Sequence, residues 1–235
     1  MYKNINELKD KHKGKDIWVI LAGSSMDYVS RDFFENKIVI GQNQVYKHYP
    51  CNYVLMKDCM EEPRFPRSIR KLDSMGIPLI FPEYYKGYHS KENCPWDPQG
   101  GEKNVVEHKN AYMFKHNPRK NSYEEELNEL KDDEIIVSKS TCTSLIHLAA
   151  YMGARNIMVC GHDCGTLDGN LYYDGYMESD WVGSENWSGI KNWMSHLQKE
   201  SQLLRNYLYE KYGCNIHSLN PFLNLSLEGH EYEAV

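Results

Sequence analysis

The chain has 235 residues, of which 41% are hydrophobic, and it carries a formal net charge of −6 at pH 7 with a pI near 5.9. A chain of this length can bury one sizeable core and suits a single domain. The negative charge argues against binding to duplex nucleic acid, which requires a basic face for the phosphates. No apolar run approaches the roughly 20 residues of a membrane-spanning helix, and the polar N-terminus is unlike a signal peptide.

The seven cysteines are an odd number and form no C-x-x-C pair. Several lie in apolar segments, where cysteine behaves as a small hydrophobic residue. We therefore expect reduced thiols and a cytoplasmic location. Cys160 and Cys164 flank His162, but this spacing does not match a zinc knuckle.

Short apolar runs recur along the chain, and each ends in glycine or polar residues. Because the runs are apolar throughout rather than alternating, they predict strands buried on both faces, as in a parallel sheet. The predicted strands cover residues 16–23, 36–43, 51–58, 77–82, 134–140, 155–163 and 214–219.

Helical patterns lie between these runs. Residues 140–153 offer Ser140 or Thr141 as an N-cap and end at Gly153, and residues 189–213 predict a longer helix. Strands that alternate with helices predict an α/β fold with a Rossmann-like, doubly wound, mostly parallel sheet.

Residues 83–133 interrupt this alternation, because they are rich in Tyr, Lys, Glu, Asn and Pro and show no clear strand pattern. A stretch this long without regular structure inside a compact domain is usually functional or mobile. We interpret it as an insertion that forms a lid over the site, with an exposed helix at 122–134. The whole chain, 1–235, is then one nucleotide-binding domain with this lid.

Small and polar residues follow the ends of five predicted strands. In an open parallel sheet, ligands bind outside the carboxyl ends of the strands, so we expect these residues to converge on one site. They are Gly23, Ser24 and Ser25; Gln42, Asn43 and Gln44; Lys57 and Asp58; Ser140 and Thr141; and the loop 161–174, which begins at Gly161.

Two predicted helix starts at this edge are suited to a phosphate. Gly23 lets the backbone approach a ligand just before Ser24 and Ser25, and four hydroxyls, including that of Thr143, gather at 140–144. Free N–H groups at a helix N-terminus favour anions, so the two together predict a diphosphate or a nucleotide phosphate. The alternative is that these are ordinary turns and caps.

Other strand-end residues are candidates for ligand contacts. Asn43 is placed to bind a base or ribose, or else it is an ordinary turn asparagine. Asp58 and Asp163 are placed to bind a metal or a sugar hydroxyl, or else they are ordinary surface aspartates at strand ends. His196 is a candidate general base, since imidazole titrates near neutral pH. A packed core position is its alternative, and His162 is the competing base.

The motifs LAGSS, GQNQ, STCTS and GARNIMVCGHD resemble those of the bacterial sialyltransferases of glycosyltransferase family 42. They are also similar to the flagellin-modifying motility-accessory-factor transferases and the archaeal 6-hydroxymethylpterin pyrophosphokinase-like proteins. The resemblance covers residues 16–60 and 135–225 and leaves 83–133 unmatched.

In the sialyltransferases the corresponding motifs surround a cytidine monophosphate donor. The resemblance implies this role for Gly23, Ser24, Asn43, Ser140, Thr141 and Asp163, to which the strand-end argument adds Ser25, Lys57, Thr143 and Gly161. It also implies that His196, which lies 25 positions before Pro221, is the general base.

The chain departs from the family pattern in its donor-binding residues. Ser24 replaces an asparagine, Cys142 a glycine, and Lys57-Asp58 a further donor-binding asparagine. Of the two tyrosines that the family places against the leaving phosphate, the first falls on Gly165, and the second corresponds to Tyr172 or Tyr173.

These observations give three hypotheses. The first is a glycosyltransferase that moves a sugar, such as a nonulosonic acid from its CMP donor, onto a glycan acceptor without a required cofactor, with His196 as base and Tyr172 or Tyr173 at the phosphate. The second is a Mg²⁺-dependent pyrophosphoryl transferase acting on a pterin-like alcohol, with Asp58 and Asp163 as metal ligands. The third is a non-catalytic nucleotide-binding protein. The oligomeric state, including a homo-oligomer, stays open.

Overall fold

The computed structural model describes residues 2–57, 64–83, 108–116, 120, 122–136, 140–164, 167, 170–176 and 190–219. The strands are β1 (Lys3–Asn4), β2 (Asp16–Ile20), β3 (Ile38–Gln42), β4 (Tyr53–Leu55), β5 (Leu79–Pro82), β6 (Ala111–His116), β7 (Glu134–Ile135), β8 (Asn156–Cys160) and β9 (Asn215–Ser218). The α-helices are α1 (Arg64–Met75), α2 (Tyr123–Asn128), α3 (Thr141–Tyr151) and α4 (Ile190–Tyr212). The 3-10 helices are η1 (Ile5–Leu8), η2 (Ser24–Tyr28), η3 (Arg31–Phe34) and η4 (Val45–Lys47).

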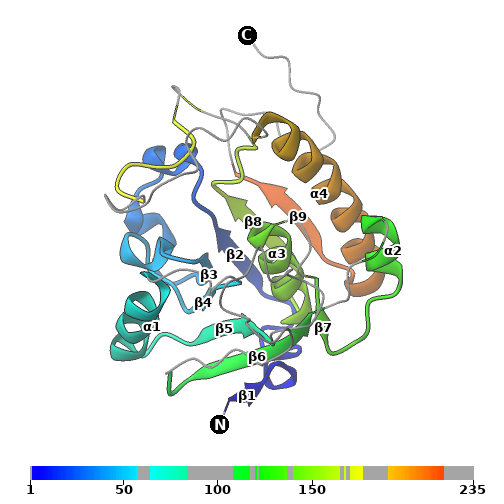
Figure 1. Cartoon of the computed structure of the whole chain (residues 1–235), viewed down its shortest axis with the longest axis horizontal. Coiled ribbons are helices and arrows are strands. Elements are labelled where there is room, and N and C mark those ends of the chain that lie inside the picture. The colour runs from blue at the N-terminus through cyan, green and yellow to red at the C-terminus, as the bar shows by residue number, and fades with distance from the viewer. Residues whose placement is uncertain are drawn as a thin grey trace, which may run out of the picture.

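The strands form one sheet in the order β1-β6-β5-β4-β3-β2-β8-β9, with β7 paired to β6 (Figure 1). Every pairing between these strands is parallel, which confirms the predicted α/β fold. From β2 the chain builds the sheet outward through β3, β4 and β5, and it later returns to add β8 and β9 on the other side of β2. The strand order therefore reverses between β2 and β8, and such a switch point is where open α/β sheets bind ligands.

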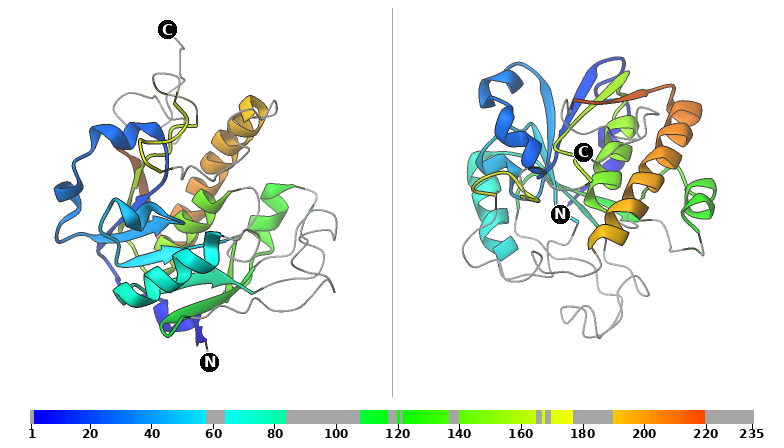
Figure 2. Two further views of the ribbon diagram at one scale, coloured as in Figure 1. Left: turned by 60° about the vertical axis from the view of Figure 1, so that its left-hand side comes forward. Right: turned by 90° about the horizontal axis from the view of Figure 1, so that it is seen from above.

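Helices cover both faces of the sheet (Figure 2). Successive side chains of a strand point to opposite faces, so Ile17 and Val19 of β2 pack in the cluster that contains α3 and α4, whereas Ile20 packs with residues of η2 and η3. Helix α1 covers the second face near β5 through Ile69 and Leu72. The sheet is thus the middle of three layers.

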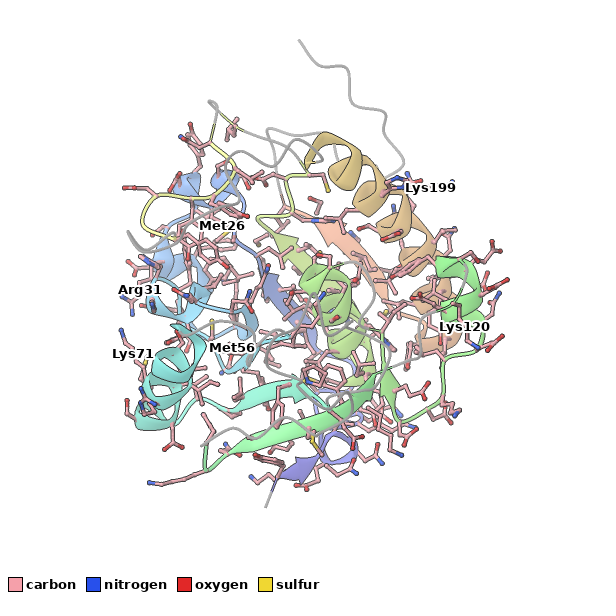
Figure 3. The ribbon with its side chains drawn as sticks, viewed as in Figure 1. Met26, Arg31, Met56, Lys71, Lys120 and Lys199 are labelled. Carbon is pink, nitrogen blue, oxygen red and sulfur yellow. The ribbon has the colours of Figure 1, made fainter. Side chains whose placement is uncertain are left out.

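Burial separates the apolar interior from the charged surface (Figure 3). Met26 and Met56 are fully buried and lie inside the ribbon. Lys71, Lys120 and Lys199 project at its periphery. Within the part of the chain that the structure describes, no helix is both long and apolar enough to cross a bilayer.

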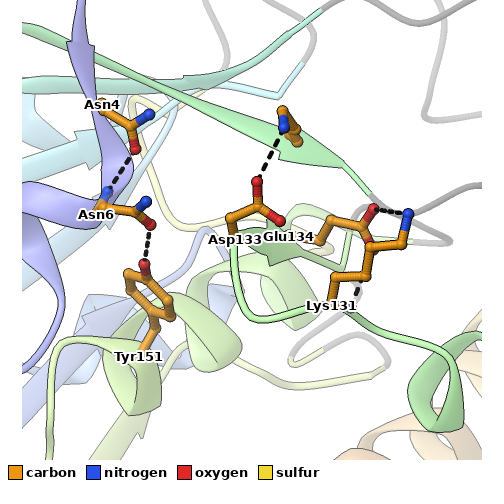
Figure 4. A network of polar contacts seen from close by, with 7 residues as sticks. Asn4, Asn6, Lys131, Asp133, Glu134 and Tyr151 are labelled. Carbon is orange, nitrogen blue, oxygen red and sulfur yellow. Dashed lines mark hydrogen bonds and ion pairs between the residues drawn. The ribbon is translucent and has the colours of Figure 1, made fainter.

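The N-terminal segment is attached to the end of α3 (Figure 4). Asn4 accepts a hydrogen bond of 2.8 Å from the backbone N–H of Asn6, which caps η1. The hydroxyl of Tyr151, the last residue of α3, donates to Oδ1 of Asn6 at 2.6 Å. These bonds hold the edge strand β1 in place beside β6, far from the switch point.

The predicted strands and the helices predicted at 140–153 and 189–213 are confirmed, since the observed β2, β3, β4, β5, β7, β8, β9, α3 and α4 each lie inside the range predicted for them. The prediction for 83–133 is wrong in part. Residues 111–116 form β6, an internal strand that pairs with β1, β5 and β7. Of the lid expected over 83–133, residues 84–107, 117–119 and 121 lie outside the described residues.

Two helix predictions also need correction. The helix expected at 122–134 is shorter, and it is not simply exposed, because Tyr123, Glu126 and Leu127 of α2 are buried. After Gly23 the chain forms the five-residue 3-10 helix η2 instead of a longer α-helix. The expected N-terminal anion site therefore has only a five-residue 3-10 helix behind it.

Candidate functional site

A cavity of about 120 Å³ lies at the carboxyl ends of β2 and β8, which is the switch point of the sheet. Strands β2 and β8 lie side by side, with α3 and α4 on the same face (Figure 1). Seven of the predicted site residues line the cavity: Gly23, Gln42, Ser140, Gly161, His162, Asp163 and Tyr172. It is also lined by residues that the sequence did not assign to a ligand, and these include Cys142, Cys164 and Leu197.

Gly23 and Gly161 allow the ends of β2 and β8 to approach closely. The N–H of Gly23 donates to the carbonyl oxygen of Gly161 at 3.0 Å. A Cβ atom on Gly23 would lie 2.5 Å from that oxygen and 2.5 Å from Oδ2 of Asp163, so only glycine fits. Gly161 has φ +71, in the left-handed region that favours glycine. Both glycines are therefore needed for the shape of the cavity floor.

The carboxylate of Asp163 occupies the start of η2. It accepts a hydrogen bond from the backbone N–H of Ser25 at 2.8 Å and from the Ser25 hydroxyl at 2.5 Å, with a longer contact of 3.5 Å to the hydroxyl of Ser24. The residue is 6% exposed. The N–H of Ser25, which the sequence assigned to a ligand phosphate, therefore binds the protein's own carboxylate.

Ser24 is used in the same way, since its hydroxyl organises the loop that follows β8. It donates to the carbonyl oxygen of Asn170 at 2.8 Å and accepts from the N–H of Leu167 at 3.2 Å. Ser24 and Ser25 therefore bond to other groups of the protein. These bonds do not support the phosphate-binding role that was predicted for the two serines.

The hydroxyl cluster at the start of α3 divides into a cap and buried groups. Ser140 caps the helix, because its Oγ accepts from the N–H of Cys142 at 3.1 Å. Thr143 is fully buried and donates to the carbonyl oxygen of Ser140 at 2.8 Å. Ser144 is also fully buried and donates to the carbonyl oxygen of Ile136 at 2.7 Å. Thr141 is buried too and does not line the cavity, so Ser140 is the member of the cluster that does.

The amides after β3 are buried and incompletely bonded. Asn43 has φ +47, and its N–H donates to the carbonyl oxygen of Leu55 at 3.0 Å. Oδ1 of Asn43 and Nε2 of Gln44 have no hydrogen-bond partner among the described residues. A buried polar atom without a partner is unfavourable by about 1–3 kcal/mol, so each is suited to a ligand group. Lys57 is half-buried after β4, and Asp58 lies outside the described residues.

The structure distinguishes the two candidate tyrosines. Tyr172 lines the cavity and forms a bridge with Gly23. Tyr173 instead packs edge-to-face on His48 and Tyr49, at 5.3 and 5.6 Å between ring centroids. Its hydroxyl is buried without a partner among the described residues, and this burial raises its pKa well above the usual range.

The two candidate histidines differ in burial. His196 lies on α4 with an exposed side chain, and the next residue, Leu197, lines the cavity. His162 also lines the cavity but is buried, and this burial lowers its pKa to about 4, so the ring is neutral at pH 7. Its Nε2 lies 3.0 Å from the hydroxyl of Ser201 on α4, a contact that sequence spacing could not reveal.

Two thiols accompany His162 in the cavity wall. Burial raises the pKa of Cys142 well above its usual range, and burial together with the charge of Asp163 raises the pKa of Cys164 to about 12. Both are therefore protonated at neutral pH. Among the described residues, no group of three or more His, Cys, Asp or Glu side chains is arranged to hold a metal ion.

The fold is similar to solved structures of a sialyltransferase. CstII from Campylobacter jejuni, in complex with a substrate analogue, cytidine-5′-monophosphate, aligns with a TM-score of 0.52 at 15% identity over 91% of this chain and 83% of that one. The sialyltransferase CST-II in complex with a trisaccharide acceptor and CMP aligns with a TM-score of 0.48 at 12% identity over 90% and 84% of the two chains. The chain matches no protein-family model and no curated protein sequence. At 15% identity, the first similarity establishes a shared fold.

Proposed function

We propose that this chain is a glycosyltransferase that transfers a sugar from a nucleotide-activated donor to a glycan acceptor. The observation that carries the proposal is the cavity at the switch point, where Gly23, Ser140, Gly161 and Tyr172 meet. The fold it shares with a sialyltransferase that binds cytidine monophosphate supports a nucleotide in this cavity.

The donor phosphate belongs at the start of α3 in this proposal. Asp163 already supplies a negative charge at the start of η2, and a second anion there would be repelled. The first turn of α3, an 11-residue helix, faces the cavity at Ser140 and Cys142. The positive end of the helix dipole favours an anion at that position. Oδ1 of Asn43 has no partner among the described residues, so it is suited to accept a hydrogen bond from the nucleotide or the sugar.

Transfer of a sugar requires a base for the acceptor hydroxyl and a group that stabilises the departing phosphate. Tyr172 is the tyrosine at the cavity, and we assign its hydroxyl to the phosphate. His196 is exposed beside a cavity-lining residue and is accessible to an acceptor, whereas His162 is enclosed by Ser201 and the two thiols. We therefore assign the general base to His196 and a positioning role to Asp163.

A thermal-shift screen of CMP, CDP, UDP, GDP and ATP, each with and without Mg²⁺, tests the binding step. A nucleotide at 100 times its Kd stabilises the fold by about 2.7 kcal/mol, so CMP or CDP should raise the Tm without Mg²⁺. If none of the five nucleotides changes the Tm, the proposal is wrong. A rise with ATP that depends on Mg²⁺ would favour the pyrophosphoryl transferase hypothesis instead.

Release of free nucleotide from CMP-sugar and other nucleotide-sugar donors, measured with a glycan acceptor, tests the catalytic step. We expect His196→Gln to lower kcat by roughly 10²–10⁴-fold, as for loss of a general base. Tyr172→Phe should lower kcat by roughly 10²–10³-fold, as for loss of a hydrogen-bond donor to developing charge. Tyr173→Phe is the matched control and should retain activity, because its hydroxyl is buried away from the cavity lining. Equal activity of the two tyrosine variants would refute the assignment.

The metal-dependent hypothesis lacks support from the site. The oxygens of Asp163 already accept hydrogen bonds from Ser25, and a metal would have to displace them. Asp58, the second ligand of that hypothesis, lies outside the described residues. We therefore do not propose it.

A further inference from the structure

Two thiols from separate elements contact the same imidazole ring in the cavity wall. Cys142 belongs to the first turn of α3, and its Sγ lies 3.5 Å from Nδ1 of His162. Cys164 follows β8, and its Sγ lies 3.7 Å from the same Nδ1 and 3.6 Å from Nε2. All three residues line the cavity, and both thiols are free.

We propose that Cys142 and Cys164 form a reversible disulfide under oxidising conditions and that this bond closes the cavity. Both sulfur atoms lie within 3.7 Å of one ring atom. The bond requires side-chain rotations and a shift of the loop that bring the two sulfur atoms to the bonding distance of about 2.05 Å. The bond would tie the start of α3 to the loop after β8. Both elements contribute to the cavity wall, and a ligand phosphate at α3 would be excluded.

The two cysteines differ in access, which gives each a separate role. Cys142 is buried, whereas Cys164 is half-buried, so an oxidant reaches Cys164 first. Cys164 also has φ +50, a conformation that residues other than glycine seldom adopt. The neighbouring Asp163 is fixed by its bonds to Ser25.

Hydrogen peroxide, as the simplest hydroperoxide, supplies the chemistry. The sulfur of Cys164 attacks the peroxide O–O bond, which gives a sulfenic acid and one water molecule. The sulfur of Cys142 then displaces the sulfenic hydroxyl, which forms the S–S bond and releases a second water molecule. Two thiols lose two electrons and two protons in total, and a dithiol reductant reverses the reaction by exchange.

The rate of this reaction is set by the protonation of the thiols. The thiolate is the reacting form, and both thiols are protonated at neutral pH because burial raises the pKa of each. Oxidation is therefore slow at pH 7 and accelerates as the pH rises. Brief exposure to oxidant at pH 7 should therefore oxidise the pair less than the same exposure at higher pH.

Peptide mapping by mass spectrometry without reductant tests the bond in the full chain. After treatment with hydrogen peroxide at pH 8.5, we expect a cross-linked pair of peptides that contains Cys142 and Cys164 and disappears with dithiothreitol. Cys164→Ser should abolish the cross-link, whereas Cys214→Ser, at a buried thiol beside β9, should retain it. If circular dichroism shows that Cys164→Ser is unfolded, Cys142→Ala replaces it with the same expectation. Absence of the cross-link when other cysteines are oxidised overturns the proposal.

Closure of the cavity has its own readout. Oxidation should abolish the nucleotide-dependent rise in Tm, and dithiothreitol should restore it; an oxidised, cross-linked protein that still binds nucleotide overturns the closure. If the reduced protein binds no nucleotide, the proposed function fails, but the inference does not. Closure is then measured by hydrogen exchange at the backbone amides of residues 161–164. The cross-link should slow the exchange of these amides, and an unchanged exchange rate would show that the cavity stays open.

Discussion

Replacement of Gly23 by alanine is the most direct test of how the switch point is built. The new Cβ would lie 2.5 Å from the carbonyl oxygen of Gly161, and 2.5 and 2.6 Å from Oδ2 and Cγ of Asp163. The contact with the carbonyl oxygen of Gly161 is a backbone contact, so no rotamer change relieves it, and β2 and β8 must separate at their carboxyl ends. The two contacts with Asp163 require in addition that its carboxylate moves away from Ser25.

The expected loss of stability follows from these two changes. Overpacking of a well-packed site destabilises by about 1–3 kcal/mol, and loss of a hydrogen bond to a charged group by about 1.5–3 kcal/mol. We therefore expect Gly23→Ala to lower the free energy of unfolding by about 2–4 kcal/mol. Urea unfolding measures this as a lower midpoint at an unchanged m-value.

The matched control is Gly14→Ala. Gly14 has φ +73, but no heavy atom lies within 4 Å of a Cβ placed there, so only the backbone conformation is penalised, by about 1 kcal/mol. A second comparison uses Asp163→Ala, which removes two of the three atoms closest to the new Cβ of residue 23. The double variant Gly23→Ala/Asp163→Ala should therefore be more stable than the sum of the two single effects predicts. If Gly23→Ala is no more destabilising than Gly14→Ala and the double variant is additive, the reasoning is refuted.

Three further predictions concern stability. Ser25→Ala removes the hydroxyl that donates to Asp163 and should lower the free energy of unfolding by about 1.5–3 kcal/mol, against under about 0.5 kcal/mol for the exposed Ser74→Ala; equal effects in urea would contradict the buried contact. Burial holds the pKa of His147 at about 3, below its unfolded value of 6.5, so the stability present above pH 6.5 is lost as the pH falls toward 3, at about 1.4 kcal/mol per pH unit. The free energy of unfolding, measured with urea at several pH values from 7 to 4.5, should fall less steeply with pH in His147→Gln than in the wild type. An equal pH dependence in the two proteins would exclude this histidine as the cause. Tyr173→Phe should leave the free energy of unfolding unchanged or raise it by up to about 1 kcal/mol, because its buried hydroxyl has no partner among the described residues, and a clear loss in the same assay would reveal one.

The central strands were predictable because both of their faces are covered. A strand such as β2 or β8 is then apolar after its first residue, Asp16 or Asn156, and stands out against polar connections. The edge strand β1 consists of only two residues, both of them exposed, and nothing in so short a segment signals a strand. β6 was missed for another reason, since its apolar start, at 111–114, is surrounded by polar segments and its partners lie far away in the sequence.

The convergence of Gly23, Gly161 and Asp163 was predictable from their position after two strands, but their contacts were not. The contacts depend on the register of the sheet, in which Ile20 of β2 pairs with Cys160 of β8. This register brings the turn after β2 level with the first residues after β8. No local pattern specifies it, because both strands are apolar after their first residue and a shift of one residue changes little in the sequence signal.

The register also determines where a negatively charged ligand can lie. Because it places Asp163 at the start of η2, the positive end of that short helix is neutralised by a buried carboxylate. A phosphate 4 Å from this carboxylate would meet a repulsion of about 4 kcal/mol at an effective dielectric constant of 20. The start of α3 carries no acidic residue in its first turn. A glycine-rich turn after the first central strand is usually taken as the phosphate site of such folds. In the function that we propose, the charge distribution of this chain favours Ser140 and the start of α3 for that role instead.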